Sequence, residues 1–426
     1  RGGGAGLIIG LMLMSIAGCA VRTPASAVRF APASDDEPSV RPVEWPAFST
    51  APIVSAAEAA EMAFSPGTDV PESIQFTERA MRLLRTRHPY LVRGEYGQAV
   101  VFESFVVREP SRKRFRIVVN ALDEAALIEA ALADEPGDLE DDNVFRFTVH
   151  LELPERIGEG ERPGGGVRGV ALHLVSLGNT GFEREVMDEL RNRGWAVLRF
   201  VPDPFTLRVL AVDRAAPEDP DRMQVVAADD LARQVDDQHA ALAEAVGGML
   251  AHLRDSRPDV RPDRMAIVGF SLGALAAPAV ALRLEGVTDA VVLVGGGADI
   301  STILIRGSLT RFDRAVRGEV RQTLMDLPRR YREASRLDGY NVGPLIRHIP
   351  TLIVHASFDA IVPSATGDLL YEQLGRPERW SYPFGHLGLF WWLPNEADEI
   401  ADWVERATQR AELNERDDER RSTRER

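Results

Sequence analysis

Met-Ala-Ile-Val-Gly-Phe-Ser-Leu-Gly, residues 265–273, is the stretch that decides the fold. Its first four residues are a short apolar run, which predicts a buried strand. The small apolar residues 274–280 predict a helix packed closely against a sheet. Between them, the G-x-S-x-G run predicts a sharp turn that strains Ser271 and exposes its oxygen at the edge of the sheet. Ser271 is therefore a candidate nucleophile, with an ordinary turn serine as the alternative.

A nucleophilic serine needs a base to take its proton and an acid to orient that base. Residues 351–356 predict a strand, and Asp359 lies in the loop that follows it. Residues 380–383 predict the last strand, and His386 follows in a glycine-flanked loop. The sequence therefore predicts Ser271 as nucleophile, His386 as general base and Asp359 as the orienting acid.

These three motifs, in this order, resemble the α/β-hydrolase superfamily. Residues 349–363 resemble its acid-bearing strand and loop, residues 385–390 resemble its histidine loop, and the resemblance covers about residues 166–411. It implies a mostly parallel sheet with helices on both faces. It also implies ester hydrolysis through an acyl-enzyme. Some members carry the acid after an earlier strand, which makes Asp299 the alternative acid, with Asp359 then a simple turn residue.

The resemblance also implies an oxyanion hole, because acyl transfer builds negative charge on the carbonyl oxygen. One donor is expected to be the backbone N–H of Leu272, the residue after the nucleophile. The second is expected to be the N–H of Leu177, with Gly178 as the alternative. The family usually has His-Gly at the start of this loop, whereas this chain has Val175-Ser176. A backbone donor does not depend on that signature.

A helix is predicted to follow this loop from about Gly181. Thr180 and Glu183 have the spacing of a capping box, in which the side chains and backbone N–H groups of the two residues bond reciprocally. Glu183 is therefore expected to act as a helix cap.

The N-terminal residues indicate export. Leu7–Ile16 is a short apolar run preceded by Arg1, so residues 1–18 predict a secretory signal peptide. Ile16-Ala17-Gly18-Cys19 resembles a bacterial lipobox, and Cys19 is the only cysteine of the chain. We expect Cys19 to be lipidated, anchoring the protein to the bacterial cell envelope; a plain cleaved signal peptide is the alternative. Ala20 favours the outer membrane, and residues 19–60 predict a flexible tether.

Composition limits the partners. A formal net charge of −15 argues against nucleic acid and against docking on anionic lipid. No H-E-x-x-H, CxxC or P-loop motif occurs, so neither a metal nor a cofactor is expected. The expected substrate is a small-molecule or lipid ester. A serine peptidase, a thioesterase, an acyltransferase and a non-catalytic binding module on the same fold are the alternatives.

The remaining chain divides into three predicted parts. Residues 61–165 predict an N-terminal extension with the first strands of the sheet, at about 98–107, 115–119 and 145–153. Residues 166–411 predict the hydrolase core, within which 301–347 predict a small helical cap. Residues 412–426 are rich in mixed charges and predict a disordered tail.

Overall fold

The computed structural model describes residues 28–30, 91–93, 99–109, 112–120, 144–154, 167–177, 181–202, 228–308 and 327–425. The predicted signal peptide, Cys19, most of the predicted tether and Gly178 lie outside the described residues.

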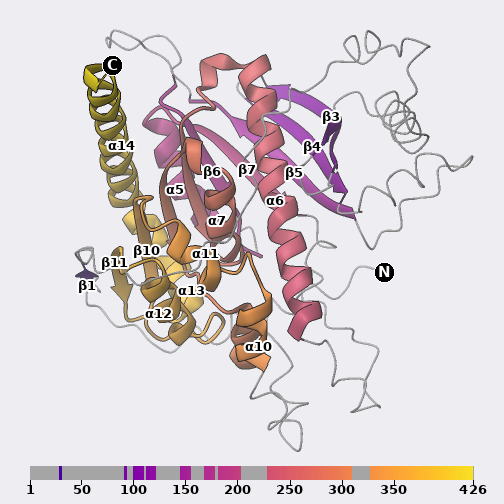
Figure 1. Ribbon diagram of the computed structural model, residues 1–426, viewed down its shortest axis with the longest axis vertical. Helices are drawn as coiled ribbons and strands as arrows, with labels where there is room; N and C mark the ends of the chain where they lie inside the picture. Colours follow the sequence, from indigo (N-terminus) through magenta and orange to yellow (C-terminus); the bar gives the residue numbers. More distant parts are fainter. Residues whose placement is uncertain are drawn as a thin grey trace, which may run out of the picture.

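The described strands form one sheet in the order β1-β11-β10-β9-β8-β6-β7-β5-β4-β3-β2 (Figure 1). Strands β7, β6, β8, β9, β10 and β11 run parallel to one another. On one side β5, β4, β3 and β2 continue the sheet in antiparallel pairs, and on the other side β1 pairs antiparallel with β11. The strands span Val28–Phe30 (β1), Leu91–Arg93 (β2), Ala99–Glu109 (β3), Arg112–Asn120 (β4), Val144–Glu152 (β5), Val170–Leu174 (β6), Ala196–Pro202 (β7), Met265–Phe270 (β8), Thr288–Val294 (β9), Thr351–Ala356 (β10) and Glu378–Tyr382 (β11).

This strand order identifies the fold. The chain enters the parallel block at β6, steps outward to β7, and then crosses back to β8 before continuing to β11. An antiparallel strand, β5, lies beside β7. That arrangement is the α/β-hydrolase fold, so the predicted fold class is confirmed. The reversal between β7 and β8 leaves a crevice beyond the carboxyl ends of the strands, which is where open α/β sheets bind ligands.

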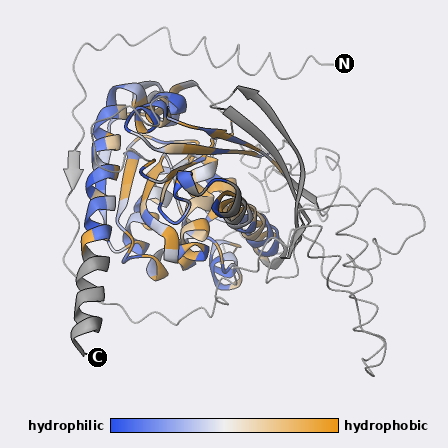
Figure 2. Cartoon of the chain, turned by 90° about the horizontal axis from the view of Figure 1, so that it is seen from above, coloured by the Kyte–Doolittle hydropathy of each residue, from blue (hydrophilic) through white to orange (hydrophobic). Residues whose placement is uncertain are grey.

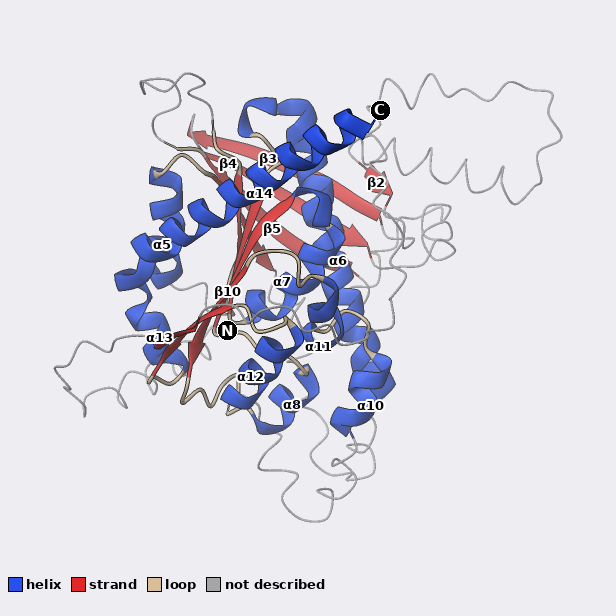
Figure 3. Cartoon of the chain, turned by 60° about the vertical axis from the view of Figure 1, so that its left-hand side comes forward, coloured by secondary structure: helices blue, strands red, loops and turns tan. Residues whose placement is uncertain are grey.

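Helices cover both faces of the sheet, with α5 and α13 on one side and α6, α7 and α11 on the other (Figure 3). The main helices span Gly181–Asn192 (α5), Ala228–Ser256 (α6), Leu272–Arg283 (α7), Ile300–Arg306 (α8), Leu327–Ala334 (α10), Gly339–Val342 (α11), Ser364–Gln373 (α12), His386–Trp392 (α13) and Ala397–Glu425 (α14). Short 3-10 helices occupy Pro258–Val260, Glu285–Val287, Gly343–Leu345 and Leu393–Glu396.

Alternation along the strands produces two separate cores. In β8, Met265 and Ile267 join the cluster that includes residues of α6 and α7. Ala266, Val268 and Phe270 join the opposite cluster, which includes residues of α5 and α14. Figure 2 shows the apolar strands enclosed between helices whose outer sides are hydrophilic. All of β8 is buried, because a strand covered on both faces has no polar side.

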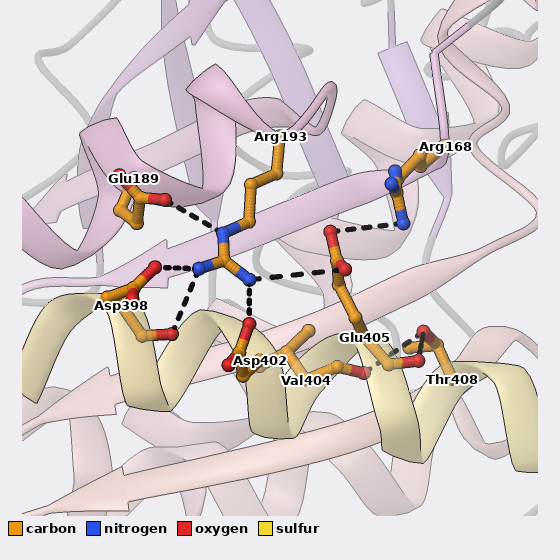
Figure 4. A network of polar contacts seen from close by, with 8 residues as sticks. All are labelled: Arg168, Glu189, Arg193, Asp398, Asp402, Val404, Glu405 and Thr408. Atoms are coloured by element: carbon orange, nitrogen blue, oxygen red, sulfur yellow. Dashed lines mark hydrogen bonds and ion pairs between the residues drawn. The ribbon is translucent and has the colours of Figure 1, made fainter.

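An arginine at the end of α5 holds α14 against the sheet (Figure 4). Arg193 Nε donates to Glu189 at 2.8 Å, and its two terminal nitrogens contact the carboxylates of Asp398 and Asp402. Arg168 adds a second link to α14 through Glu405 at 3.0 Å. Because several charges share one planar guanidinium, this network holds its geometry better than an isolated surface pair would.

Two expectations about the chain ends are wrong. Residues 28–30 of the predicted tether form β1, because the edge of β11 offers unpaired backbone groups that a short extended segment can satisfy. The predicted disordered tail is helical as far as Glu425. Residues 397–425 contain no glycine or proline and are rich in glutamate, arginine and alanine, which all favour helix.

The strands expected within residues 98–153 are present as β3, β4 and β5. Of the predicted cap, the structure describes residues 301–308 and 327–347. Asp338 connects α10 to the loop after β9: its carboxylate accepts from the Tyr331 hydroxyl at 2.9 Å and from the N–H of Asp299 at 2.8 Å. Asp236 of α6 accepts from the N–H groups of Arg336 and Leu337. The described residues of the predicted cap are thus tied to the core by two carboxylates, that of buried Asp338 and that of half-buried Asp236.

Candidate active site

Ser271 lies at the sharp turn between β8 and α7. Its φ of 49° and ψ of −108° lie where only glycine is comfortable, so the backbone is strained at this residue. The N–H of Ser271 donates to Val294 of β9 at 2.8 Å, which holds the turn against the neighbouring strand. A Cβ at Gly269 would lie 2.7 Å from the carbonyl oxygen of Gly273, so the tight turn requires glycine there. The local sequence and the fold together aim the serine oxygen at the carboxyl edge of the sheet.

The structure brings Ser271, His386 and Asp359 together from three separate segments of the chain. His386 Nδ1 donates to Asp359 Oδ2 at 2.6 Å, and the Ser271 hydroxyl donates to His386 Nε2 at 2.9 Å. The carboxylate can only accept, which places the imidazole proton on Nδ1 and leaves Nε2 free to receive the serine proton. All three residues are buried.

Asp359 is itself held in place by backbone donors. Its Oδ1 accepts from the N–H groups of Ile361 and Val362, each at 2.9 Å, while Oδ2 faces the imidazole. The alternative acid, Asp299, is engaged elsewhere as the N-cap of α8. Its side chain accepts from the backbone and hydroxyl of Thr302 and from the hydroxyl of Ser301. In this structure Asp359 is the acid that contacts the imidazole.

His386 begins α13 and so lies at the start of a short helix, where a loop was expected. Its ring is 5.1 Å from the ring of Phe390, one helical turn further on. Gly295, with a φ of 60°, lies directly against the imidazole, since a Cβ there would be 3.2 Å from His386 Cε1. The ring is therefore packed on one side by Phe390 and approached closely by backbone on another.

The two expected oxyanion donors lie at the start of α7 and in the loop after β6. Leu272 is the first residue of α7, and the first N–H groups of a helix have no acceptor within it. Leu177 follows β6, which is the strand paired with β8. The ends of these two elements meet: a Cβ at Gly273 would lie 2.1 Å from the carbonyl oxygen of Leu174. The fold thus places the start of α7 directly beside the end of β6, the strand that Leu177 follows.

Glu183 has buried partners beyond the predicted capping box, whose other member, Thr180, lies outside the described residues. Its carboxylate is fully buried and turns toward the loop after β6, where it accepts from the Ser176 N–H at 3.1 Å and from the Ser176 hydroxyl. His173 Nε2 donates to the same carboxylate at 3.2 Å. One signal in the sequence could have indicated this burial. Glu183 shares the helical spacing i, i+3, i+7 with the buried residues Val186 and Leu190.

A small cavity of about 70 Å³ opens beside the expected oxyanion site. Its wall is mostly apolar and combines the ends of β5, β6 and β7 with faces of α6 and α7. The lining residues are Phe147, Leu174, Val175, Phe200, Pro202, Gln238, His239, Leu242, Leu272, Gly273 and Ala276.

Apolar side chains are exposed on the same loops that carry the candidate residues. Leu177 is 48% exposed on the expected oxyanion loop, Phe358 is 72% exposed beside Asp359, and Leu387 is 45% exposed beside His386. Trp391, on the same helix as His386, is 69% exposed. Trp392 does pack, with its ring 5.8 Å from that of Phe384.

No group of His, Cys, Asp and Glu side chains suited to a metal ion occurs within the part of the chain that the structure describes. Over the same residues, no helix combines the length and apolar composition that crossing a membrane requires.

No family model matches this sequence, and no curated protein matches it. Among solved structures, it is similar to an acetyl xylan esterase from Paenibacillus sp. R4, at 18% identity and a TM-score of 0.44, over 82% of this chain and 99% of that one. It is also similar to the Pyrococcus furiosus esterase Pf2001, at 14% identity and a TM-score of 0.41, over 63% of this chain and 88% of that one. Acetyl xylan esterase 1 from Thermoanaerobacterium sp. JW/SL YS485 matches at 16% identity and a TM-score of 0.42, over 75% of this chain and 90% of that one. The fold assignment rests on the strand order, and the activity must be argued from the site.

Proposed function

We propose that this protein is a serine hydrolase that cleaves carboxylic esters through an acyl-enzyme. One observation carries the proposal: the His386 imidazole lies between the Ser271 hydroxyl and the Asp359 carboxylate, within hydrogen-bond distance of both. This imidazole can take the serine proton at Nε2 while the carboxylate orients it at Nδ1. This is the arrangement required to activate a serine.

The proposed reaction has two steps. Ser271 Oγ attacks the ester carbonyl carbon while His386 Nε2 takes its proton, and the N–H groups of Leu272 and Leu177 stabilise the negative carbonyl oxygen. The imidazolium then protonates the departing alcohol, leaving an ester on Ser271. Water attacks this acyl-enzyme as His386 again accepts a proton, and the acid leaves with Ser271 restored. Asp359 stays ionised throughout and stabilises the imidazolium.

The cavity beside Leu272 suggests the kind of ester. An apolar cavity of about 150 Å³ holds a benzene molecule, and this one is about half that size. Its lining by Val175, Leu272 and Ala276 suits an acyl group of two to four carbons. We therefore infer that short acyl esters are the preferred substrates.

The deciding experiment is covalent labelling with a fluorophosphonate, which reacts only with an activated serine. Residues 20–426 would be treated beside Ser271→Ala and His386→Ala. Labelling of the parent alone, with hydrolysis of p-nitrophenyl acetate, would support the proposal. A folded parent that neither labels nor turns over would favour a non-catalytic binding module. Turnover of aminoacyl anilides in preference to esters would favour a peptidase.

We also propose export and lipid anchoring through Cys19, on the sequence of residues 7–19. In a bacterial host, Cys19→Ser should abolish incorporation of labelled fatty acid and release the protein from the membrane fraction. A variant that stays in the membrane fraction without the cysteine would contradict the anchor.

A further inference from the structure

The buried carboxylate of Glu183 lies directly beneath the loop after β6. It accepts from both the N–H and the hydroxyl of Ser176, and from His173 Nε2 at 3.2 Å. Glu183 and His173 are 0% and 1% exposed, and Ser176 is buried as well. Three hydrogen-bond donors therefore converge on the Glu183 carboxylate. Two of them belong to Ser176, the residue before Leu177.

The ionisation states of Glu183 and His173 favour these hydrogen bonds. Burial by itself would raise the pKa of Glu183, but hydrogen bonds from His173 and Ser176 outweigh burial and lower it. Burial lowers the pKa of His173, which keeps the ring neutral and able to donate through Nε2. An ionised acceptor with neutral donors gives short, strong hydrogen bonds.

The same cluster contacts the catalytic strand. The His173 ring lies 5.1 Å from that of Phe270, the residue before Ser271. Phe270 lies 6.5 Å from Phe390, whose ring is 5.1 Å from His386. The Glu183 carboxylate is thus joined to the rigid end of β6 on one side and to the loop on the other.

We propose that Glu183 is a positioning residue that holds the Ser176–Leu177 turn so that the Leu177 N–H faces the oxyanion. The inference rests on the proposed function, since it assigns a role in that reaction. The turn needs a constraint, because Leu177 is half exposed and the loop lacks the His-Gly signature usual in the family. A buried acceptor fixed on α5 provides that constraint. α5 also presents its positive N-terminal end to the carboxylate, because Glu183 lies in its first turn.

The test compares Glu183→Ala with Glu183→Gln in steady-state ester hydrolysis. Alanine leaves Ser176 and His173 without an acceptor, so the turn is free to shift. We expect kcat to fall about 10-fold to 100-fold with KM little changed, since loss of one oxyanion donor costs about 100-fold to 1,000-fold. Glutamine can accept from the Ser176 N–H through its oxygen and donate to the Ser176 hydroxyl through its amide. It should recover kcat to within a few fold of the parent.

A trifluoromethyl ketone gives an independent readout, because its adduct with Ser271 carries an oxyanion. Its affinity should weaken in Glu183→Ala by the same factor as kcat/KM. Ser176→Ala removes the hydroxyl contact alone, keeps the backbone contact, and should lower kcat about threefold to tenfold. If Glu183→Ala fails to fold, Ser176→Ala tests the proposal in its place.

Glu244→Ala is the matched control. Glu244 is another buried carboxylate, paired with Arg283 at 2.8 Å between α6 and α7. Its loss should lower thermal stability but leave kcat of the folded enzyme unchanged. The proposal is overturned if Glu183→Ala loses stability like Glu244→Ala yet keeps the parent's kcat and inhibitor affinity. It is also overturned if glutamine is as poor as alanine. A parent that fails to label with fluorophosphonate would instead overturn the proposed function, and this role with it.

Discussion

The carbonyl oxygen of Leu174 occupies the space that a side chain on Gly273 would need. A Cβ at Gly273 would lie 2.1 Å from that oxygen and 2.5 Å from its carbonyl carbon. Backbone at the end of β6 cannot move aside without disturbing its pairing with β7 and β8. The second glycine of the G-x-S-x-G run is thus the point where the turn at Ser271 touches the end of β6, just before the expected oxyanion loop.

We therefore expect Gly273→Ala to damage both stability and activity. Overpacking a rigid site costs about 1–3 kcal/mol, and relief by separating the two loops would misplace the oxyanion donors. Urea unfolding and kcat/KM for p-nitrophenyl acetate would measure the two effects. Gly286→Ala is the control, since nothing lies within 4 Å of a Cβ there. Equal behaviour of the two variants would contradict the predicted contact.

Asp359→Asn should lower kcat about 10,000-fold, the magnitude measured when the corresponding aspartate of a serine protease was changed to asparagine. The amide can still accept from Ile361 and Val362, so the loop should stay folded. Its NH₂ group would face His386 Nδ1 and favour the wrong tautomer. Steady-state kinetics with circular dichroism would separate activity from folding.

Asp299→Asn provides the contrast, because Asp299 caps α8 and the imidazole contacts Asp359. We expect little change in kcat and only a small loss of stability, because asparagine caps a helix about as well as aspartate. If Asp299→Asn abolished turnover while Asp359→Asn retained it, the assignment of the acid would be reversed.

Stability should fall as the pH drops below about 6.5. Burial, together with the nearby Arg379 charge, lowers the pKa of His355 to about 4. Between these pH values the unfolded chain binds a proton that the folded chain refuses, so protonation favours unfolding. The stability from this residue is fully present above the unfolded pKa and is lost as the pH falls through the folded one. Over this window the loss amounts to at most about 3 kcal/mol.

Burial also lowers the pKa values of His173 and His239, which adds to the same trend. Urea unfolding measured between pH 7 and pH 4 would test it, with His355→Gln expected to flatten the curve. A slope that is identical in the parent and in His355→Gln would argue against this source of acid sensitivity.

Ala276→Leu should shift the acyl-chain preference of the enzyme. Ala276 lines the cavity of about 70 Å³ next to Leu272, and a leucine there would fill much of it. We expect kcat/KM to fall about tenfold for butyrate and much less for acetate, because the smaller acyl group needs less of the space. The p-nitrophenyl ester series measures this directly. An equal loss for both esters would indicate that the acyl group binds elsewhere.

Local sequence determined the strand–turn–helix at Ser271, the order of Asp359 and His386 after it, and most of the strands. Each of these follows from short-range patterns: a buried run, a turn residue, a fixed spacing. The glycines within residues 269–273 allow the close backbone approach of a sharp turn. That turn could therefore be predicted without the rest of the molecule.

Tertiary structure decided which hydrogen-bond partner a residue takes when its local sequence allows more than one. Asp299 and Asp359 both follow core strands, and only the folded loops bring Asp359 to the imidazole. Glu183 has the spacing of a capping box with Thr180, but only the fold places its carboxylate beside His173 and Ser176. Residues 28–30 form a strand only because the edge of β11 offers them a partner. Such choices depend on contacts between residues far apart in the chain, and no local pattern contains them.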